Sequence, residues 1–300
     1  MTYLAFDLGG TNIKYAVVTE DGDILIKDKF PSSQTTFEEL INAMGEVHRK
    51  LAKDFSFLGI ALSLPGAPNN ETGFVRGASA LPFIHGPNLH EALFQETGLQ
   101  VYAENDAKCA ALCEVWKGAA KDVDNSLFII IGTGIGGAIV VNRQVHQGVN
   151  LLAGEYGYMI LHSDFKKQEF HTFSNLGSTG SLVRAIAKKK GISNDSITGE
   201  EIFDLAFYGD IDCQEAIEVF YENIAVALFT LIYTFDPEKI IIGGAISARA
   251  DLIDKISEKL EIIKLNIRPV EKEIDPPIVR CQYGGDANLL GAVYNYKLKS

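Results

Sequence analysis

The chain begins with three short apolar runs separated by turn-forming residues. Strands are predicted at Thr2–Phe6, Ile13–Thr19 and Ile24–Phe30, because each run is rich in aliphatic and aromatic residues and is bounded by Gly, Asp or Asn. The connections at 7–11 and 20–23 are short enough to be tight turns. This pattern predicts three strands joined in consecutive hairpins.

Helical and strand patterns then alternate. Apolar residues recur with a helical period through Thr36–Lys53, which predicts an amphipathic helix. Strands are predicted at Leu58–Leu64 and Val101–Ala103, and helices at Leu89–Thr97 and from Ala107 onward. Hairpins followed by alternating helices and strands predict a mixed sheet covered by helices.

The second half of the chain follows the same order. Strands are predicted at Ser126–Ile131, Ala138–Val141, Lys239–Ile242 and Ile278–Cys281, and helices at Ser178–Lys190, Gly199–Tyr208, Cys213–Thr234, Ser247–Leu265 and Asp286–Lys297. Sequence similarity between the halves is too thin to count as an internal repeat, although the order of elements is shared. We therefore predict two α/β domains, residues 1–118 and 119–285, with residues 286–300 folding back onto the first.

Composition narrows the class of protein. Three hundred residues with 47% hydrophobic content are enough for two domains. A net charge of −12 makes nucleic acid and anionic membranes poor partners. Four cysteines without a framework spacing fit a reducing compartment. The N-terminus lacks the pattern of a signal peptide, and we find no apolar run approaching the roughly 18 residues of a membrane span. We expect a cytoplasmic protein.

Two glycine-rich turns are candidate phosphate sites. Gly132–Gly137 matches G-x-G-x-x-G, but a dinucleotide fingerprint must open a helix and here a strand is predicted to follow. What remains is a hairpin turn whose backbone N–H groups and Thr133 hydroxyl can line an anion. Asp7–Thr11 has the same form, and its carboxylate would suit Mg²⁺ held through water. Either turn alone could be a plain hairpin; together, and with Gly243-Gly244 after a third strand, they favour phosphate binding.

A carboxylate stands at one predicted strand-to-helix junction. Glu104-Asn105-Asp106 follows the strand at 101–103, and either Asn105 or Asp106 would cap the next helix. The carboxyl ends of strands are where α/β sheets bind ligands. Asp106 could serve only as a cap, but in combination with two phosphate turns it predicts phosphoryl transfer.

Five motifs, taken in order, resemble those of the ROK sugar kinases. They are Asp7–Thr11, Glu104–Ala107, Gly132–Gly137, Gly154–Tyr158 and Ile240–Ser247. That family includes bacterial glucokinases, N-acetylmannosamine kinases, fructokinases and β-glucoside kinases. The resemblance covers nearly the whole chain and implies the actin/hexokinase-like (ribonuclease H-like) α/β fold, with two domains of mixed sheets flanked by helices. It also implies ATP, Mg²⁺ and a sugar bound in the cleft between the domains, but not which sugar.

The resemblance implies a role for individual residues. Asp106 matches the general base that takes the proton from the sugar hydroxyl, and Asp7 would hold Mg²⁺ through water. The residues implied to bind the ATP phosphates are Asp7, Gly9, Gly10, Thr11, Lys14, Thr133, Gly134 and Gly136, and those at the adenosine are Gly243 and Gly244. The residues implied to bind the sugar are Gly66, Ser79, Asn105, Asp106, Glu155, Tyr158 and Ser174.

The chain departs from the family at a zinc site. Most members hold a structural zinc with one His and three Cys, but here Tyr158 stands at the His position and 163–181 contains no Cys. A tetrahedral zinc site without its thiols is not expected. His162 and His171 are expected to face solvent in a polar loop.

Two further departures concern the sugar. Ser174 stands where the family has a Glu that reaches the anomeric end of the sugar, and Ala80 replaces an Asn that contacts it. One contact is then missing, or is supplied by Ser79 or His85. A shorter side chain leaves space beside the anomeric carbon, which favours a glycoside or disaccharide. The alternative is drift around an unchanged glucose pocket.

The predicted function is that of a kinase placing phosphate on the 6-hydroxyl of a hexose or β-glucoside. An N-acetylmannosamine kinase and a non-catalytic sugar sensor are the alternatives. A DNA-binding ROK repressor is disfavoured, because the first predicted strand begins at Thr2 and no basic surface is indicated. The family also implies a homodimer.

Overall fold

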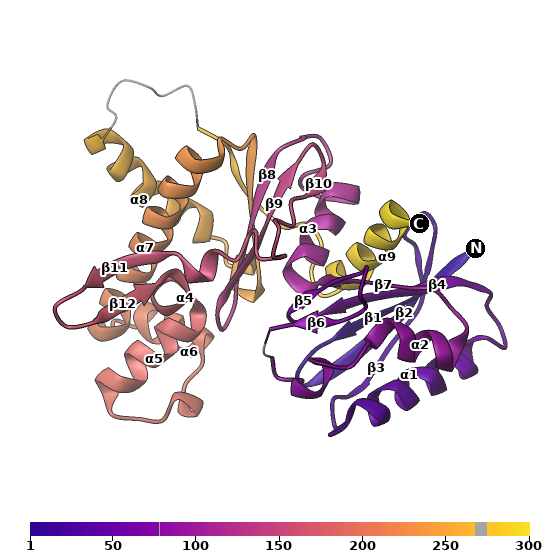
Figure 1. The fold of residues 1–300 in the computed structure, drawn as a ribbon. Coiled ribbons are helices and arrows are strands. Elements are labelled where there is room, and N and C mark those ends of the chain that lie inside the picture. Colours follow the sequence, from indigo (N-terminus) through magenta and orange to yellow (C-terminus); the bar gives the residue numbers. More distant parts are fainter. Residues whose placement is uncertain (78, 268–274) are drawn as a thin grey trace. The chain divides into compact units, whose positions relative to one another are not determined.

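The chain folds into two compact units (Figure 1). The computed structural model describes residues 1–77, 79–267 and 275–300. The first unit comprises residues 1–121, 147–153 and 282–300, and the second comprises 122–146 and 154–281. The division into units differs from the predicted domain boundaries at residues 147–153, which were predicted to lie in the second domain. This segment belongs to the first unit because Lys108 of that unit donates hydrogen bonds to Gln147 and Leu151.

The first unit is built on a five-stranded sheet with the order β3-β2-β1-β4-β7. Its strands are β1 (Thr2–Leu8), β2 (Asn12–Thr19), β3 (Ile24–Pro31), β4 (Phe57–Leu64) and β7 (Val101–Asn105). The first three are antiparallel, whereas β4 and β7 run parallel to β1. The parallel strands therefore end at the same edge of the sheet, where β1 delivers its last residues beside those of β4 and β7.

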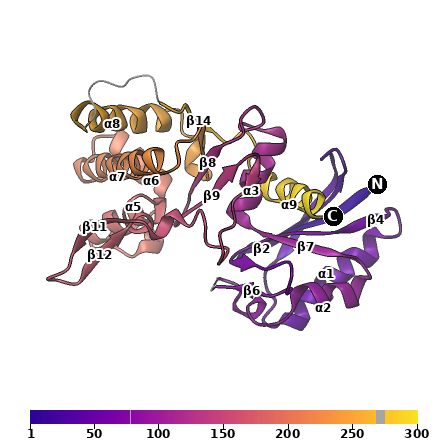
Figure 2. The same ribbon diagram turned by 45° about the horizontal axis from the view of Figure 1, so that its top comes forward.

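Helices cover both faces of this sheet (Figure 2). Helices α1 (Phe37–Leu51) and α2 (Leu89–Thr97) pack on the face that buries Leu4 and Phe6 of β1. Helices α3 (Asp106–Lys117) and α9 (Ala287–Lys299) pack on the opposite face. Successive side chains of a strand point to opposite faces, so β1 contributes to both cores. The shorter elements of this unit are β5 (Ala67–Pro68), β6 (Val75–Arg76) and the 3₁₀ turn η1 (Pro82–Ile84).

The second unit repeats this sheet topology. Its strands are β8 (Ser126–Ile131), β9 (Ile135–Val141), β10 (Gln144–Val145), β13 (Lys239–Gly243) and β14 (Ile278–Arg280), in the order β10-β9-β8-β13-β14. Here too three antiparallel strands come first and two parallel ones follow. The shared order of elements predicted from the sequence is thus matched by a shared strand order and direction.

Helices and a hairpin complete the second unit. The helices are α4 (Phe173–Leu176), α5 (Thr179–Lys190), α6 (Gly199–Phe207), α7 (Ile211–Phe235) and α8 (Leu252–Ile267), and the 3₁₀ turns are η2 (Tyr156–Tyr158), η3 (Asn194–Ser196) and η4 (Ala245–Ala248). Strands β11 (Ile160–Asp164) and β12 (Glu169–Thr172) form the hairpin. His162 and His171 are cross-strand partners in it, with ring centroids 5.8 Å apart. Their predicted placement in a polar loop was wrong.

Helix α7 corrects the expectation that no apolar run is long enough to span a membrane. It has 25 residues and contains an 18-residue window with a mean hydropathy of 1.5. Half of that window is buried inside the structure, and residues such as Phe220, Ile224 and Leu228 are buried. A long apolar helix is also what the core of a folded domain requires.

Gly291 is expected to be essential for packing α9 on α3. A Cβ at this position would lie 1.7 Å from the carbonyl oxygen of Cys109. Gly291→Ala should therefore destabilise the first unit by about 1–3 kcal/mol, since backbone must shift to relieve the overlap. Gly284→Ala is the control, because a Cβ there meets nothing within 4 Å. Urea unfolding monitored by circular dichroism measures both, and equal midpoints would contradict this account of the helix pair.

Candidate active site

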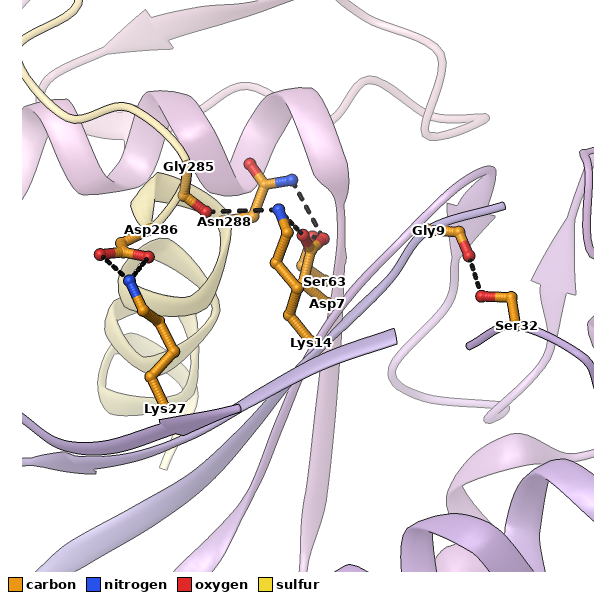
Figure 3. Close-up of polar contacts among 9 residues, drawn as sticks. All are labelled: Asp7, Gly9, Lys14, Lys27, Ser32, Ser63, Gly285, Asp286 and Asn288. Carbon is orange, nitrogen blue, oxygen red and sulfur yellow. Dashed lines mark hydrogen bonds and ion pairs between the residues drawn. The ribbon is translucent and has the colours of Figure 1, made fainter. Parts of the chain in front are cut away.

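Asp7 is held in a fixed orientation at the end of β1. Its Oδ1 accepts hydrogen bonds from the Ser63 hydroxyl at 2.8 Å and from Asn288 Nδ2 at 3.0 Å. Its Oδ2 lies 3.3 Å from Lys14 Nζ. Figure 3 shows these three side chains, from β4, α9 and β2, converging on the carboxylate. A carboxylate offers about four lone-pair positions, so three donors leave acceptor capacity for a water-coordinated cation.

The segment leading into α9 borders this carboxylate. The carbonyl oxygen of Gly285 lies 3.4 Å from Lys14 Nζ, and Asp286 pairs with Lys27 at 2.8 Å (Figure 3). The sequence analysis missed Ser63 and Asn288 as partners of Asp7, from which they are 56 and 281 residues distant. No local motif could have indicated either contact.

The first glycine turn exposes backbone next to Asp7. Gly10 and Thr11 are exposed, and the Ser32 hydroxyl fixes the turn by donating to the Gly9 carbonyl at 2.6 Å (Figure 3). A Cβ on Gly10 would lie 2.8 Å from the methyl group of Ala80. Glycine is therefore needed for this close approach, and the accessible backbone is suited to binding an anion.

Asn105, rather than Asp106, caps α3. Its Oδ1 accepts from the backbone N–H groups of Ala107 and Lys108 at 3.0 and 3.2 Å, and its Nδ2 donates to the Gly66 carbonyl at 3.0 Å. These contacts use one of the two N–H groups of the Asn105 amide. Asp106 is exposed in the first turn, and its Oδ1 accepts from the Ala107 N–H at 2.8 Å.

A buried polar network supports the residues on either side of Asp106. Glu104 accepts from Asn105 N at 2.8 Å and from Gln147 Nε2 at 2.5 Å. Burial raises the pKa of this carboxyl above its usual value. Lys108 Nζ donates to Gln147 Oε1 at 2.8 Å and to the Leu151 carbonyl at 2.9 Å. Buried hydrogen bonds therefore hold the strand–helix junction that carries Asp106. The sequence did not indicate these contacts.

Ser79 is oriented by His85. The Ser79 hydroxyl lies 2.8 Å from His85 Nε2, and His85 Nδ1 lies 3.3 Å from the Val75 carbonyl. Because a carbonyl can only accept, Nδ1 carries the proton in the neutral ring and Nε2 accepts from Ser79. The two residues named as candidates for one sugar contact are thus a hydrogen-bonded pair, in which His85 sets the direction of the Ser79 hydroxyl.

The second glycine turn is shorter than predicted. Strand β9 begins at Ile135, so Gly136 is paired with Ile130 within the sheet, and the turn is limited to 132–134. Gly132 N donates to the Gly134 carbonyl at 2.9 Å, and the Ser174 hydroxyl accepts from Ile135 N at 2.9 Å. Ser174 therefore anchors this turn, a role that was not foreseen for it.

One cavity of about 1070 Å³ lies within the second unit. It is lined by residues of the predicted second phosphate turn and of the segment that follows the predicted adenosine turn. Thr133 of the glycine turn lines it, as does Ala245, the residue after Gly243-Gly244. Gly244 has φ +92°, and a Cβ there would lie 2.1 Å from the Ile131 carbonyl. The close approach of these two chain segments thus depends on glycine.

The residues predicted to bind the sugar belong to two different units. Gly66, Ser79, Asn105 and Asp106 belong to the first unit, while Glu155, Tyr158 and Ser174 belong to the second. Glu155 is half-buried at the start of η2, and Tyr158 is 78% exposed. Within residues 1–77, 79–267 and 275–300, no three His, Cys, Asp or Glu side chains are grouped to hold a metal ion.

Comparison with known proteins bears on this arrangement. The sequence model of the ROK family matches residues 3–298. A beta-glucoside kinase of Listeria monocytogenes is 36% identical over 99% of this chain and 97% of its own. A ROK family protein from Streptococcus pneumoniae TIGR4, solved in complex with sucrose, has a TM-score of 0.89 and 38% identity, covering 100% and 99% of the two chains.

A ROK family glucokinase from Streptomyces griseus, solved with glucose and AMPPNP, has a TM-score of 0.78 and 25% identity, covering 98% of each chain. The two mixed sheets flanked by helices therefore form the actin-like ATPase fold, as the sequence predicted.

Proposed function

Because this chain belongs to the ROK family and is a sugar kinase, we propose that it transfers the γ-phosphoryl group of ATP to the 6-hydroxyl of a hexose or β-glucoside. The observation that carries this proposal is Asp106, an exposed carboxylate at the carboxyl end of β7 and the first turn of α3. Its neighbours on both sides are fixed, and Asn105 supplies the helix cap. The exposure of Asp106 at this junction supports a role in catalysis.

Asp106 acts as the general base in this proposal. It accepts the proton of the sugar 6-hydroxyl as that oxygen forms its bond to phosphorus, and ADP leaves with the electron pair of the broken bond. The transition state of phosphoryl transfer is loose, so positioning matters more than covalent chemistry. The network of Glu104, Gln147 and Lys108 serves that positioning by holding the strand–helix junction.

Asp7 fits the requirements of a magnesium site. Mg²⁺ prefers oxygen ligands and keeps several of its waters, and the Asp7 carboxylate is fixed by Ser63, Asn288 and Lys14 with lone pairs remaining. When bound, Mg²⁺ would neutralise charge on the β- and γ-phosphates. The backbone at Gly10 and Thr11 would bind phosphate oxygens, and the exposure of this turn supports that role.

The residues around the sugar support a β-glucoside as substrate. Ser174 and Ala80 replace two larger polar residues that the family uses on the sugar, and a relative 36% identical is named a beta-glucoside kinase. Ser79, directed by His85, offers a hydroxyl in place of the missing amide.

An ADP-release assay with ATP and Mg²⁺ tests this proposal across a panel of sugars. The panel contains glucose, fructose, mannose, N-acetylmannosamine, cellobiose, gentiobiose and an aryl β-glucoside. We expect turnover of the glycosides to exceed that of free glucose. Faster turnover of N-acetylmannosamine than of the other sugars would contradict the proposed substrate and would favour an N-acetylmannosamine kinase. No turnover on any sugar, with tight sugar binding by calorimetry, would identify a sensor and refute the kinase.

We further propose that the protein holds no structural zinc. The support is chemical: Tyr158 carries no soft ligand, and no Cys lies between Ser163 and Ser181. His162 and His171 face each other on a hairpin, which supplies two nitrogens and no thiolate. Elemental analysis of the purified protein should find zinc well below one ion per chain. One tightly held zinc per chain would contradict the proposal.

A further inference from the structure

An arginine in the cavity of the second unit is held rigidly on an aromatic ring. The guanidinium carbon of Arg249 lies 3.8 Å from the ring centroid of Phe203. Its Nε and Nη2 each donate to the Asp251 carboxylate at 3.1 Å. Phe203 is buried, and its ring lies 6.5 Å from that of Tyr221. The plane of the guanidinium is thus fixed on one face and along one edge.

This arrangement contributes little to stability. The side chains of Arg249 and Asp251 are 35% and 46% exposed, and ion pairs with that exposure are worth about 0–1 kcal/mol. Its consequence is orientation, because a bidentate pair fixes the plane of a guanidinium as well as its position. The Arg249 side chain is partly exposed, and both Arg249 and Phe203 line the cavity.

The same cavity extends to the second glycine turn. Thr133 and Gly180 line it, and a Cβ on Gly180 would lie 2.3 Å from the Thr133 carbonyl. The cavity therefore holds a turn suited to phosphate and a flat cation suited to stacking. Arginine planes stack on nucleobases by dispersion and cation–π attraction. One elongated ligand with an anionic end and an aromatic end matches both features.

The charges of the cavity restrict that ligand further. Asp195, Glu200 and Asp204 line it together with two cations, Arg184 and Arg249. A polyanionic chain extending through the cavity would pass three carboxylates. A nucleoside places a neutral ring and ribose there instead, and a carboxylate can accept from ribose hydroxyls or an exocyclic amine.

We propose that Arg249 is the platform on which the base of the phosphoryl donor stacks, with Asp251 and Phe203 as its positioning residues. This inference rests on the proposed kinase function and deepens it, because it assigns the residue that recognises the donor. Arg249 recognises the base without taking part in the transfer of phosphate.

Calorimetric binding of Mg²⁺–AMPPNP to the full chain tests the platform without requiring turnover. Arg249→Met removes the planar cation, and should weaken binding about 10- to 100-fold, the range for loss of one stacking partner of a base. Arg249→Lys keeps the charge and should not restore affinity. Lys255→Met is the control, because it removes an exposed cation of α8 that pairs with Glu258. Its affinity should equal that of the wild type.

A second ligand separates base recognition from phosphate recognition. Inorganic triphosphate with Mg²⁺ lacks the base, so it should bind to the wild type more weakly than AMPPNP does. Its affinity for Arg249→Met should equal its affinity for the wild type. Unchanged AMPPNP affinity in Arg249→Met, full rescue by Arg249→Lys, or triphosphate binding as tight as AMPPNP would each overturn the inference. If AMPPNP binding depended on Arg249 but the wild type phosphorylated no sugar, the proposed function would be refuted. The inference about Arg249 would still be supported.

Discussion

Replacing Asp106 by Asn is expected to lower kcat about 10²- to 10⁴-fold, the range for loss of a general base. The amide has nearly the same shape and can still accept from the Ala107 N–H, which Asp106 Oδ1 does at 2.8 Å. It cannot take the proton of an attacking hydroxyl. Sugar affinity measured by calorimetry should therefore stay within a few-fold of the wild type while turnover is lost.

Glu38→Gln is the matched control for this experiment. Glu38 is an exposed carboxylate in the first turn of α1, in the same unit as Asp106. Its loss changes the net charge and the helix N-terminus in the same way, so kcat should not change. Near-normal turnover of Asp106→Asn, or an equal loss in Glu38→Gln, would show that Asp106 is not the base.

Asp7→Asn should be the second most damaging change, with kcat lowered about 10²- to 10³-fold, as for loss of a preorganised electrostatic group in other active sites. Three donors converge on this carboxylate: the Ser63 hydroxyl, the Asn288 amide and the Lys14 ammonium. An amide in its place has one acceptor oxygen and points an N–H group at one of those donors. The Mg²⁺ concentration needed for half-maximal activity should rise as well.

Asp286→Asn is the control for Asp7. Its carboxylate pairs with Lys27 at 2.8 Å, whereas the Asp7 carboxylate pairs with Lys14 (Figure 3). Exposed pairs of this kind contribute about 0–1 kcal/mol to stability. Activity titrated against Mg²⁺ should be unchanged in Asp286→Asn. If Asp7→Asn gave the same Mg²⁺ dependence as the wild type, the carboxylate would have no part in holding the metal.

The sheets could be predicted from the sequence because their strands are buried apolar runs with clear turns between them. β1 and β8 are buried along nearly all of their length. β8 has the predicted bounds, and β1 extends from the predicted end at Phe6 to Leu8. The β11–β12 hairpin was missed because residues such as Glu169 and Phe170 are exposed and the segment carries no alternating pattern. Exposed strands need few apolar residues, so the pattern of apolar residues along the sequence does not identify them.

The candidate site was assigned from motif positions, and the contacts around those positions were not indicated by the sequence. Asp7 and Asp106 stand out locally, since each ends a strand at a turn or a helix. Their supports, such as Asn288 and Gln147, are brought in by tertiary folding and have no sequence signal of their own. Ser174 was identified as a substitution, but its bond to the Ile135 N–H was not, because any residue carries a backbone donor.

The position of phosphate on the reaction product tests the central claim most directly. Purified protein would be incubated with ATP, Mg²⁺ and an aryl β-glucoside, and the product examined by phosphorus–proton correlated NMR. The account predicts one phosphomonoester, coupled to the two protons on carbon 6 of the glucosyl ring, with stoichiometric ADP. Phosphate on another carbon, or inorganic phosphate released without any sugar ester, would contradict it.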